Sequence, residues 1–395
     1  MNCRKGYFVF SFFYFSVFMS AGVYNTFFPY WLSYKDLSVI QISVVLSVPF
    51  AVKIIADPFW GAVADKNFSR KRLMMFLSAA TAFCYSFYLF VSGYYSAMAV
   101  ALLCGFFWSS VMPIGDSIIS ISSNVSKERF GAMRMFGSLS VLLMVIVAGF
   151  LFTLSGDLTI VMLMFCFFMT FIAVCLLPEP AHYNSALTKV QKHLVCNGCA
   201  SVSAPRVLMI MLASSLCLGA HGIIYVLGSL HWVRLGYSPV EISSLWAAAL
   251  LSEIVIFFLA DKRYLIGLSP VCCILSGALL GIIRWSGLAI VESYEGILIL
   301  QSLQGGTLAL VVISIMRYSQ SHIPENFRSR YFGRLAAISH GTIPLIVTVI
   351  SGALYEGISG LAMAMGAILC GASVIICIRE IYMSRSHDIG SLRTN

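Results

Sequence analysis

The stretch "GAVADK" at residues 61–66 returns in altered form as "FFLADK" at residues 257–262. Each copy closes a long apolar run with an acidic and a basic residue. A second pair, "RFG" at 129–131 and "YFG" at 331–333, opens a later apolar run in each half of the chain. Motifs that recur at equivalent places in two halves indicate a parallel internal repeat.

The composition indicates a membrane protein. Hydrophobic residues make up 59% of the 395 residues, 10% are charged, and the mean hydropathy is +0.91. A soluble domain carries about 25% charged residues. The net charge of +9 does not indicate a nucleic-acid partner, because the basic residues sit in short turns between apolar runs. The first apolar run continues to Trp31, too long for a signal peptide, so we expect an uncleaved first span.

Twelve apolar stretches are long enough to cross a bilayer as helices, which takes about 20 residues. They are 7–33, 41–64, 73–93, 96–122, 132–154, 158–177, 206–232, 240–259, 265–286, 296–320, 332–355 and 358–378. If the N-terminus is cytoplasmic, 18 of the 25 Lys and Arg residues fall on cytoplasmic flanks, five lie within or near spans, and only Lys35 and Arg234 fall outside. This asymmetry predicts twelve spans with both termini in the cytoplasm.

The longest polar connection divides the chain into two sets of six spans. We expect an N-terminal six-helix bundle at 1–177, a cytoplasmic loop at 178–205, and a C-terminal bundle at 206–395 that ends in a short cytoplasmic tail. The loop contains "HLVCNGC" at 193–199, whose single C-x-x-C is more often a coincidence than a zinc or redox site. We therefore expect no metal.

Several motifs resemble the major facilitator superfamily. "GAVADKNFSRKR" at 61–72 is similar to its loop between spans two and three, although Phe68 stands where glycine is common. Other motifs resemble the 3-phenylpropionate permease branch: "PIGDSI" (113–118), "RMFGS" (134–138), "GAHGIIY" (219–225), "GYSPVEISSLWAAALLSEIVIFFLADK" (236–262), "GIIRW" (281–285) and "MRY" (316–318). The resemblance implies an all-α membrane protein of two six-helix bundles. It also implies proton-linked uptake of a small solute, such as an aromatic carboxylate, across a bacterial inner membrane.

Two carboxylates inside apolar stretches are candidates for proton coupling. Glu253 lies about 12 Å of helix from Asp261, too deep for its short side chain to reach water. Asp116 follows Pro113, which we expect to bend its helix. Burial favours the neutral form of a carboxyl group, which suits a group that loads and unloads a proton. For both residues the alternative is a polar group that joins neighbouring helices.

Four residues near the expected midplane are candidates for substrate binding or for charge balance. Lys53 lies about 18 Å of helix from Asp65, and Asp57 follows it at the spacing of an intrahelical ion pair. Either the two charges neutralise each other, or a substrate carboxylate competes for Lys53. His221 and Tyr225 share a helix face, which we interpret as lining a central cavity. The alternative is a histidine whose hydrogen bonds are satisfied within the core.

The first span is rich in aromatic residues, in "GVYNTFFPYW" at 22–31. Aromatic side chains can stack on an aromatic solute, and they also favour membrane interfaces. Packing accounts for most of this stretch, and we single out Tyr24 and Asn25 as candidate substrate contacts.

Four residues are candidates for gating or structure. Gly61 has no side chain, so a neighbouring helix can approach it closely. Asp65 lies on the same helix face, where its carboxylate can cap the positive N-terminus of a helix that starts in the cytoplasm. Arg134 opens the fifth span and is a candidate for the inner gate, or an anchor at the cytoplasmic face. Arg284 lies about 33 Å of helix from Lys262, which places it at the outer interface. There its long stem reaches water, or it serves capture and gating at the outer mouth.

These residues favour a secondary transporter that works by alternating access around a midplane site. The sequence has no P-loop, so we do not expect ATP hydrolysis to power transport. It also lacks the enzyme motifs H-E-x-x-H and G-x-S-x-G. The alternatives are a carrier of the same fold for a sugar, a nucleoside or drug efflux, and a membrane sensor that transports nothing. We expect a small-molecule substrate with protons, a surrounding lipid bilayer, no cofactor, no nucleic acid and a monomer.

Overall fold

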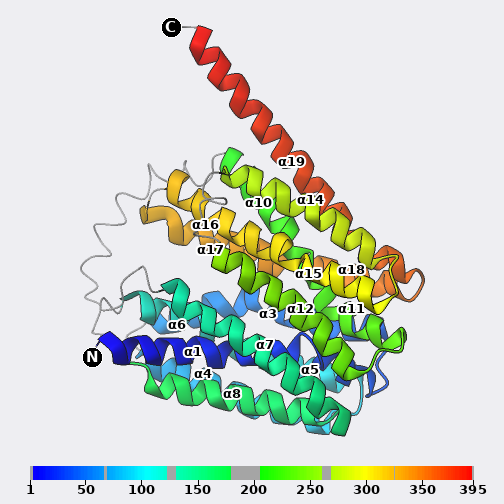
Figure 1. Cartoon of the computed structure of the whole chain (residues 1–395). Coiled ribbons are helices and arrows are strands. Elements are labelled where there is room, and N and C mark those ends of the chain that lie inside the picture. Colours follow the sequence, from blue (N-terminus) through cyan, green and yellow to red (C-terminus); the bar gives the residue numbers. More distant parts are fainter. Residues whose placement is uncertain are drawn as a thin grey trace. The chain divides into compact units, whose positions relative to one another are not determined.

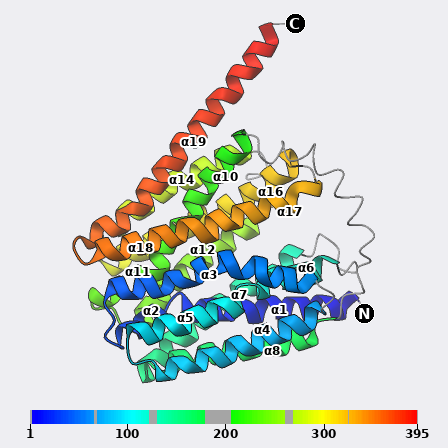
Figure 2. The same cartoon turned by 180° about the vertical axis from the view of Figure 1, so that it is seen from behind.

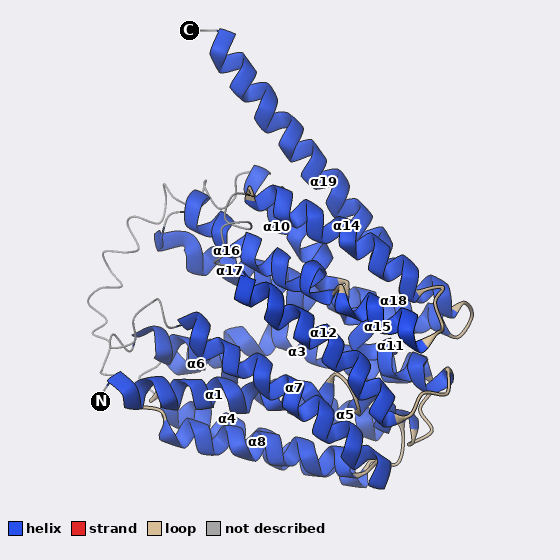
Figure 3. Ribbon diagram, in the orientation of Figure 1, coloured by secondary structure: helices blue, strands red, loops and turns tan. Residues whose placement is uncertain are grey.

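The computed structural model describes residues 3–65, 69–121, 130–178, 205–259, 268–323 and 325–393. All regular secondary structure in these ranges is helical (Figure 1, Figure 3). Within them, twelve helical segments are long and apolar enough to cross a membrane. Lipid offers no hydrogen bonds to a backbone, so a span satisfies its own N–H and C=O groups by forming a helix. The predicted all-α fold with twelve spans is confirmed.

Six of these segments come from the first half of the chain, and some consist of two consecutive helices. The helices are α1 (Cys3–Tyr24), α2 (Phe28–Ser33), α3 (Val39–Asp65), α4 (Arg70–Ser86), η1 (Phe87–Phe90), α5 (Tyr94–Trp108), α6 (Val111–Ile121), α7 (Phe130–Leu154) and α8 (Leu158–Leu176).

The other six segments follow the polar connection. Their helices are α10 (Pro205–Gly219), α11 (His221–Arg234), α12 (Pro239–Leu259), α14 (Pro270–Leu288), α15 (Tyr294–Ser302), η3 (Gly305–Ala309), α16 (Leu310–His322), α17 (Glu325–Ala337), η4 (Ile338–Thr342), α18 (Ile343–Tyr355) and α19 (Ser359–Arg393).

The interruptions within spans have local causes. Pro113 has no N–H to donate to the carbonyl of Ser109, so the fourth span turns at Ser109 and Ser110 before α6 begins. This is the bend that the sequence predicts at Pro113. In the tenth and eleventh spans, η3 and η4 are single π-helical turns. Such turns are found frequently at functional sites.

The chain forms two compact units. The first contains residues 1–183, 224–250 and 348–356, and the second contains 184–223, 251–347 and 357–395. The predicted division into halves at 178–205 stays a prediction.

In the first unit, α1 packs along α7 and α8, α4 packs along α8, and α3 packs along α5 (Figure 2). Its buried core includes Phe10, Phe13 and Tyr14 of α1 together with Trp60 of α3. In the second unit, α14 and α10 both pack along α19, and α16 packs on α14. Lipid is as apolar as these side chains, so close packing between the helices, rather than removal of apolar surface from water, holds each unit together.

The starts of α3 and α12 repeat one local structure. The N–H of Ser38 donates to the side chain of Gln41, and the N–H of Gln41 donates to Ser38 Oγ. Ser238 and Glu241 exchange the same two hydrogen bonds. This reciprocal arrangement satisfies backbone N–H groups at a helix start. The two helices that lead into "GAVADK" and "FFLADK" therefore begin alike.

Candidate functional site

The second unit buries two opposite charges. Arg284 of α14 is 0% exposed and Glu253 of α12 is 8% exposed. Gln304, the residue before η3, joins them. Its Oε1 accepts a hydrogen bond from Arg284 Nη2 at 2.6 Å, and its Nε2 donates to Glu253 Oε1 at 2.5 Å. Two charges that the sequence places in separate apolar stretches therefore belong to one buried network.

The network extends from Arg284 to His221 at the start of α11. Gln301 Oε1 accepts from Arg284 Nη2 at 2.7 Å, and Thr307 Oγ1 lies 3.5 Å from Arg284 Nη1. His221 Nε2 lies 3.2 Å from Thr307 Oγ1, and its Nδ1 lies 3.1 Å from the carbonyl oxygen of Cys217. A carbonyl only accepts, so Nδ1 carries a proton and Nε2 of the neutral ring is an acceptor. The Thr307 hydroxyl has one proton, for which Nε2 and the carbonyl oxygen of Gln304 compete.

Backbone contact between α12 and η3 holds the network in place. The N–H of Gly305 donates to Ser252 Oγ at 2.9 Å, and a Cβ added at Gly305 would collide with the carbonyl of Ser252. These two residues directly neighbour Gln304 and Glu253 in the sequence. The side chains that bond each other therefore extend from backbones that already touch.

The expectation that Arg284 reaches water is wrong. Arg284 lies four residues before the end of α14, and its guanidinium is wholly buried. The covering residues are Gln301, Gln304 and Thr307, which sequence reasoning missed because uncharged polar side chains do not stand out in an apolar run. Their spacing of three residues was the available signal, since it places polar groups on one face of a helix.

His221 is 1% exposed, and both of its ring nitrogens face partners within the second unit. Its ring also lies edge-on to Trp285, with centroids 5.8 Å apart. Both ring nitrogens are therefore occupied by hydrogen bonds within the network. The predicted contact of His221 with a solute stays a prediction.

The expected ion pair between Lys53 and Asp57 is not formed. Both residues are described and partly exposed on α3, yet Asp57 Oδ1 accepts a hydrogen bond from Ser110 Oγ at 2.8 Å instead. The close helix approach expected at Gly61 is also wrong for the described residues, since a Cβ added there meets none of their atoms within 4 Å.

The remaining candidates lie in the first unit. Asp116 accepts a hydrogen bond from the Tyr14 hydroxyl at 2.6 Å. Tyr24 stacks on Phe28 with centroids 4.9 Å apart. Asn25 begins the turn between α1 and α2. None of these arrangements tests the predicted roles.

Tyr225, also in the first unit, stacks on Trp246 with ring centroids 6.0 Å apart. Asp65 is the last residue of α3 and Arg134 lies in α7, but their side chains fall outside the described residues, as does the whole segment 193–199.

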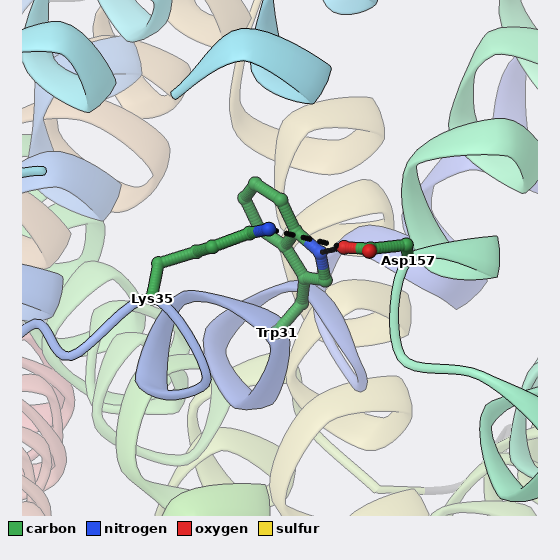
Figure 4. A network of polar contacts seen from close by, with 3 residues as sticks. All are labelled: Trp31, Lys35 and Asp157. Carbon is green, nitrogen blue, oxygen red and sulfur yellow. Dashed lines mark hydrogen bonds and ion pairs between the residues drawn. The ribbon is translucent and has the colours of Figure 1, made fainter. Parts of the chain in front are cut away.

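A surface cluster joins the end of α2 to the turn before α8 (Figure 4). Trp31 Nε1 donates to Asp157 Oδ1 at 2.8 Å, and Lys35 Nζ lies 3.2 Å from the same oxygen. The Lys35 ammonium also lies 5.2 Å from the centroid of the Trp31 ring. The hydrogen bond from Trp31, aided by Lys35, lowers the pKa of Asp157. This cluster fixes two turns of the first unit.

Comparisons with known proteins agree with this architecture. The family model described as "MFS_1 like family" matches residues 7–365. The chain is 23% identical over 348 residues to the "Probable 3-phenylpropionic acid transporter" of Escherichia coli (strain K12), covering 87% of this chain and 89% of that protein. It is 24% identical over 362 residues to the maltose permease of Geobacillus stearothermophilus, covering 88% and 87%. The crystal structure of nucleoside transporter NupG has a TM-score of 0.75 at 17% identity, covering 97% of this chain and 99% of that one.

Proposed function

Because the chain belongs to the MFS_1 like family, we propose that it couples proton movement to the uptake of a small organic anion. The family membership confirms the resemblance to the major facilitator superfamily, and with it a multi-pass membrane transporter rather than an enzyme. Proton coupling and the solute go beyond the family assignment and rest on the residues of the site.

The observation that carries the proposal is the link from Glu253 through Gln304 to Arg284. A carboxyl group buried in an apolar unit changes the local charge by one whenever it gains or loses a proton. Arg284 is buried beside it, and in such surroundings a change of charge alters the energy of a neighbouring cation strongly. Proton binding at Glu253 therefore alters the network, which makes Glu253 the proposed proton carrier. Asp116, bonded to Tyr14, is a second candidate in the first unit.

The proposed solute contact is Lys53. It is partly exposed and makes no ion pair with Asp57, so its ammonium group is available for a carboxylate. Tyr24, Asn25 and Tyr225 are the proposed contacts for an aromatic group. His221 is a candidate only if it gives up its bond to Thr307. The relative named as a 3-phenylpropionic acid transporter supports an aromatic carboxylate as the first solute to test.

We propose a bacterial inner membrane as the location, with both termini in the cytoplasm. The distribution of Lys and Arg along the sequence supports this orientation. Attaching a reporter enzyme to the C-terminus tests it, since a reporter active only outside the cytoplasm stays silent there.

Transport into proteoliposomes tests the function. With an inward proton gradient, the wild-type protein is expected to accumulate radiolabelled 3-phenylpropionate above its outside concentration. Glu253→Gln should abolish this accumulation but preserve exchange of labelled for unlabelled solute, because exchange moves no net proton. The matched control is Glu295→Gln, which neutralises an exposed carboxylate on α15 and should transport normally.

Three outcomes contradict parts of the proposal. Normal accumulation by Glu253→Gln rules out coupling through that residue. Transport of maltose or a nucleoside in place of 3-phenylpropionate, in the same assay, assigns a different solute. Equal uptake with and without the proton gradient means that the carrier is not proton-coupled.

A further inference from the structure

We propose that Gln304 is the positioning residue that transmits the charge state of Glu253 to Arg284, an inference that rests on the proposed proton coupling. Gln304 bonds both residues through a single amide group. It is 1% exposed, so water does not replace either partner.

The chemistry of the partners fixes the direction of this amide. An arginine side chain only donates hydrogen bonds, so Gln304 Oε1 has to face Arg284. The NH₂ group then faces Glu253, which accepts when it is ionised. Turning the amide over would place its NH₂ against the guanidinium and its oxygen against the carboxylate. The ionised form of Glu253 therefore locks Gln304 in the orientation that holds Arg284.

Protonation of Glu253 removes this lock. A hydrogen bond to a carboxylate is roughly twice as strong as one between neutral groups. Once Glu253 is neutral, its O–H can also donate to Gln304 Oε1, so the overturned amide keeps its bond to Glu253. In that orientation Arg284 loses the Gln304 oxygen as an acceptor. The proton on Glu253 thus decides whether Gln304 helps to hold the guanidinium.

The backbone around Gln304 is held in place, so the protonation of Glu253 changes side-chain hydrogen bonds and not the contact between the helices. The bond from the Gly305 N–H to Ser252 Oγ keeps α12 and η3 together whatever the charge of Glu253. The carbonyl oxygen of Gln304 accepts from Thr307 Oγ1 at 3.1 Å, and that hydroxyl also lies beside Arg284 and His221. Because Arg284 contacts this hydroxyl too, a change in how Gln304 holds Arg284 reaches His221 through Thr307.

The other charged and titratable groups near the network come from different elements. They are Arg284 of α14, His221 of α11 and the exposed His340 of η4. Gln301 provides a matched control. It bonds the same Nη2 atom of Arg284 at 2.7 Å from three residues before Gln304, yet the structure gives it no bond to Glu253. Its Nε2 has no hydrogen-bond partner among the described residues.

The test measures the protonation of Glu253 without any solute. Infrared difference spectra of the whole protein in liposomes follow the carboxyl C=O band as the pH is changed, and the band lost in Glu253→Gln belongs to that residue. Gln304→Met keeps the side-chain volume but removes the amide, so the titration midpoint is expected to move by about one pH unit, a tenfold change in proton concentration. Gln301→Met should leave the midpoint near its wild-type value.

An unmoved midpoint in Gln304→Met, or an equal shift in Gln301→Met, overturns the proposal. A wild-type protein in which no band titrates overturns it as well, because Glu253 then keeps one charge state. If Gln304→Met does not fold, Gln304→Asn serves, since its shorter amide cannot reach both partners and predicts the same shift. A shifted midpoint in a protein that shows no proton-driven transport would support the link while contradicting the proposed function.

Discussion

Ser43 lies against Gly352 in the same way that Ser243 lies against Gly149. A Cβ added at either glycine would collide with the serine side chain opposite it. Ser243 Oγ also donates to the carbonyl of Val145, one turn before Gly149 on α7. The serines occupy equivalent positions in α3 and α12, each five residues after the serine that caps its helix. The first unit therefore contains two similar glycine–serine contacts, one made by each of the two helices that begin alike.

Adding one methyl group at these contacts should destabilise the protein. Gly149→Ala places a Cβ against Ser243 and 2.9 Å from the carbonyl of Pro239, and a backbone atom cannot move aside cheaply. We expect a loss of about 1–3 kcal/mol, seen as a lower thermal unfolding temperature in detergent. Gly371→Ala is the control, because its Cβ meets no described atom within 4 Å. Equal unfolding temperatures for the two variants would contradict the prediction.

The buried charges should depend on each other. Arg284→Met leaves Glu253 buried without its compensating charge, so we expect a loss of about 3–5 kcal/mol in stability. The double variant Arg284→Met with Glu253→Met removes both charges and should recover much of that loss. Thermal unfolding of the two single variants and the double variant measures the coupling. Additive losses would mean that Gln304 does not link the two charges.

Most of the fold could be predicted from the sequence, because the membrane imposes it. Apolar runs of about 20 residues have to become helices in lipid, and this alone gave the number of spans. Pro113 gave the turn in the fourth span through its missing N–H. The π-helical turns η3 and η4 were not predicted, since they depend on how neighbouring helices pack and no residue type marks them.

The candidate site could be predicted in part. Glu253 and His221 stood out because a titratable group in an apolar run has to find a partner. The partners themselves did not stand out, since glutamine and threonine occur in helices for many reasons. Counting residues places Arg284 near the end of its helix, but a position along a helix does not tell whether a side chain points to lipid, water or a neighbouring span. Its burial under Gln301 and Gln304 required the structure.

The surface cluster at Trp31 should make stability depend on pH. The pKa of Asp157 is lowered in the folded protein, first by the Trp31 hydrogen bond and then by Lys35. A lowered folded pKa gives stability that is present above the unfolded pKa of about 4 and lost as the pH falls through the folded pKa. Asp157 is 64% exposed, so we expect no more than about 1 kcal/mol.

Asp157→Asn should therefore unfold at a lower temperature than wild type at pH 7, and the difference should shrink as the pH is lowered to about 3. Asp36→Asn is the control, because Asp36 is exposed in the nearby turn and asparagine also tolerates its positive φ of 59°. A difference for Asp157→Asn that is constant with pH would mean that its charge plays no part.

Replacing Lys53 should weaken the binding of an anionic solute. Lys53→Gln keeps a polar side chain of similar length but removes the charge that we propose meets the solute carboxylate. We expect the apparent affinity for 3-phenylpropionate to fall at least about tenfold, or about 1.4 kcal/mol. Asp57→Asn should not rescue this loss, because Asp57 is bonded to Ser110 rather than to Lys53. Competition against radiolabelled solute during exchange measures both affinities.

Lys35→Gln is the matched control for the loss of one positive charge, since Lys35 pairs with Asp157 in a turn of the first unit. Its affinity for the solute should equal that of wild type, although its stability should fall slightly. If the double variant Lys53→Gln with Asp57→Asn regains wild-type affinity, the two charges serve only to balance each other during transport. The carboxylate of the solute would then have to bind another cation, and Arg284 would be the next residue to test.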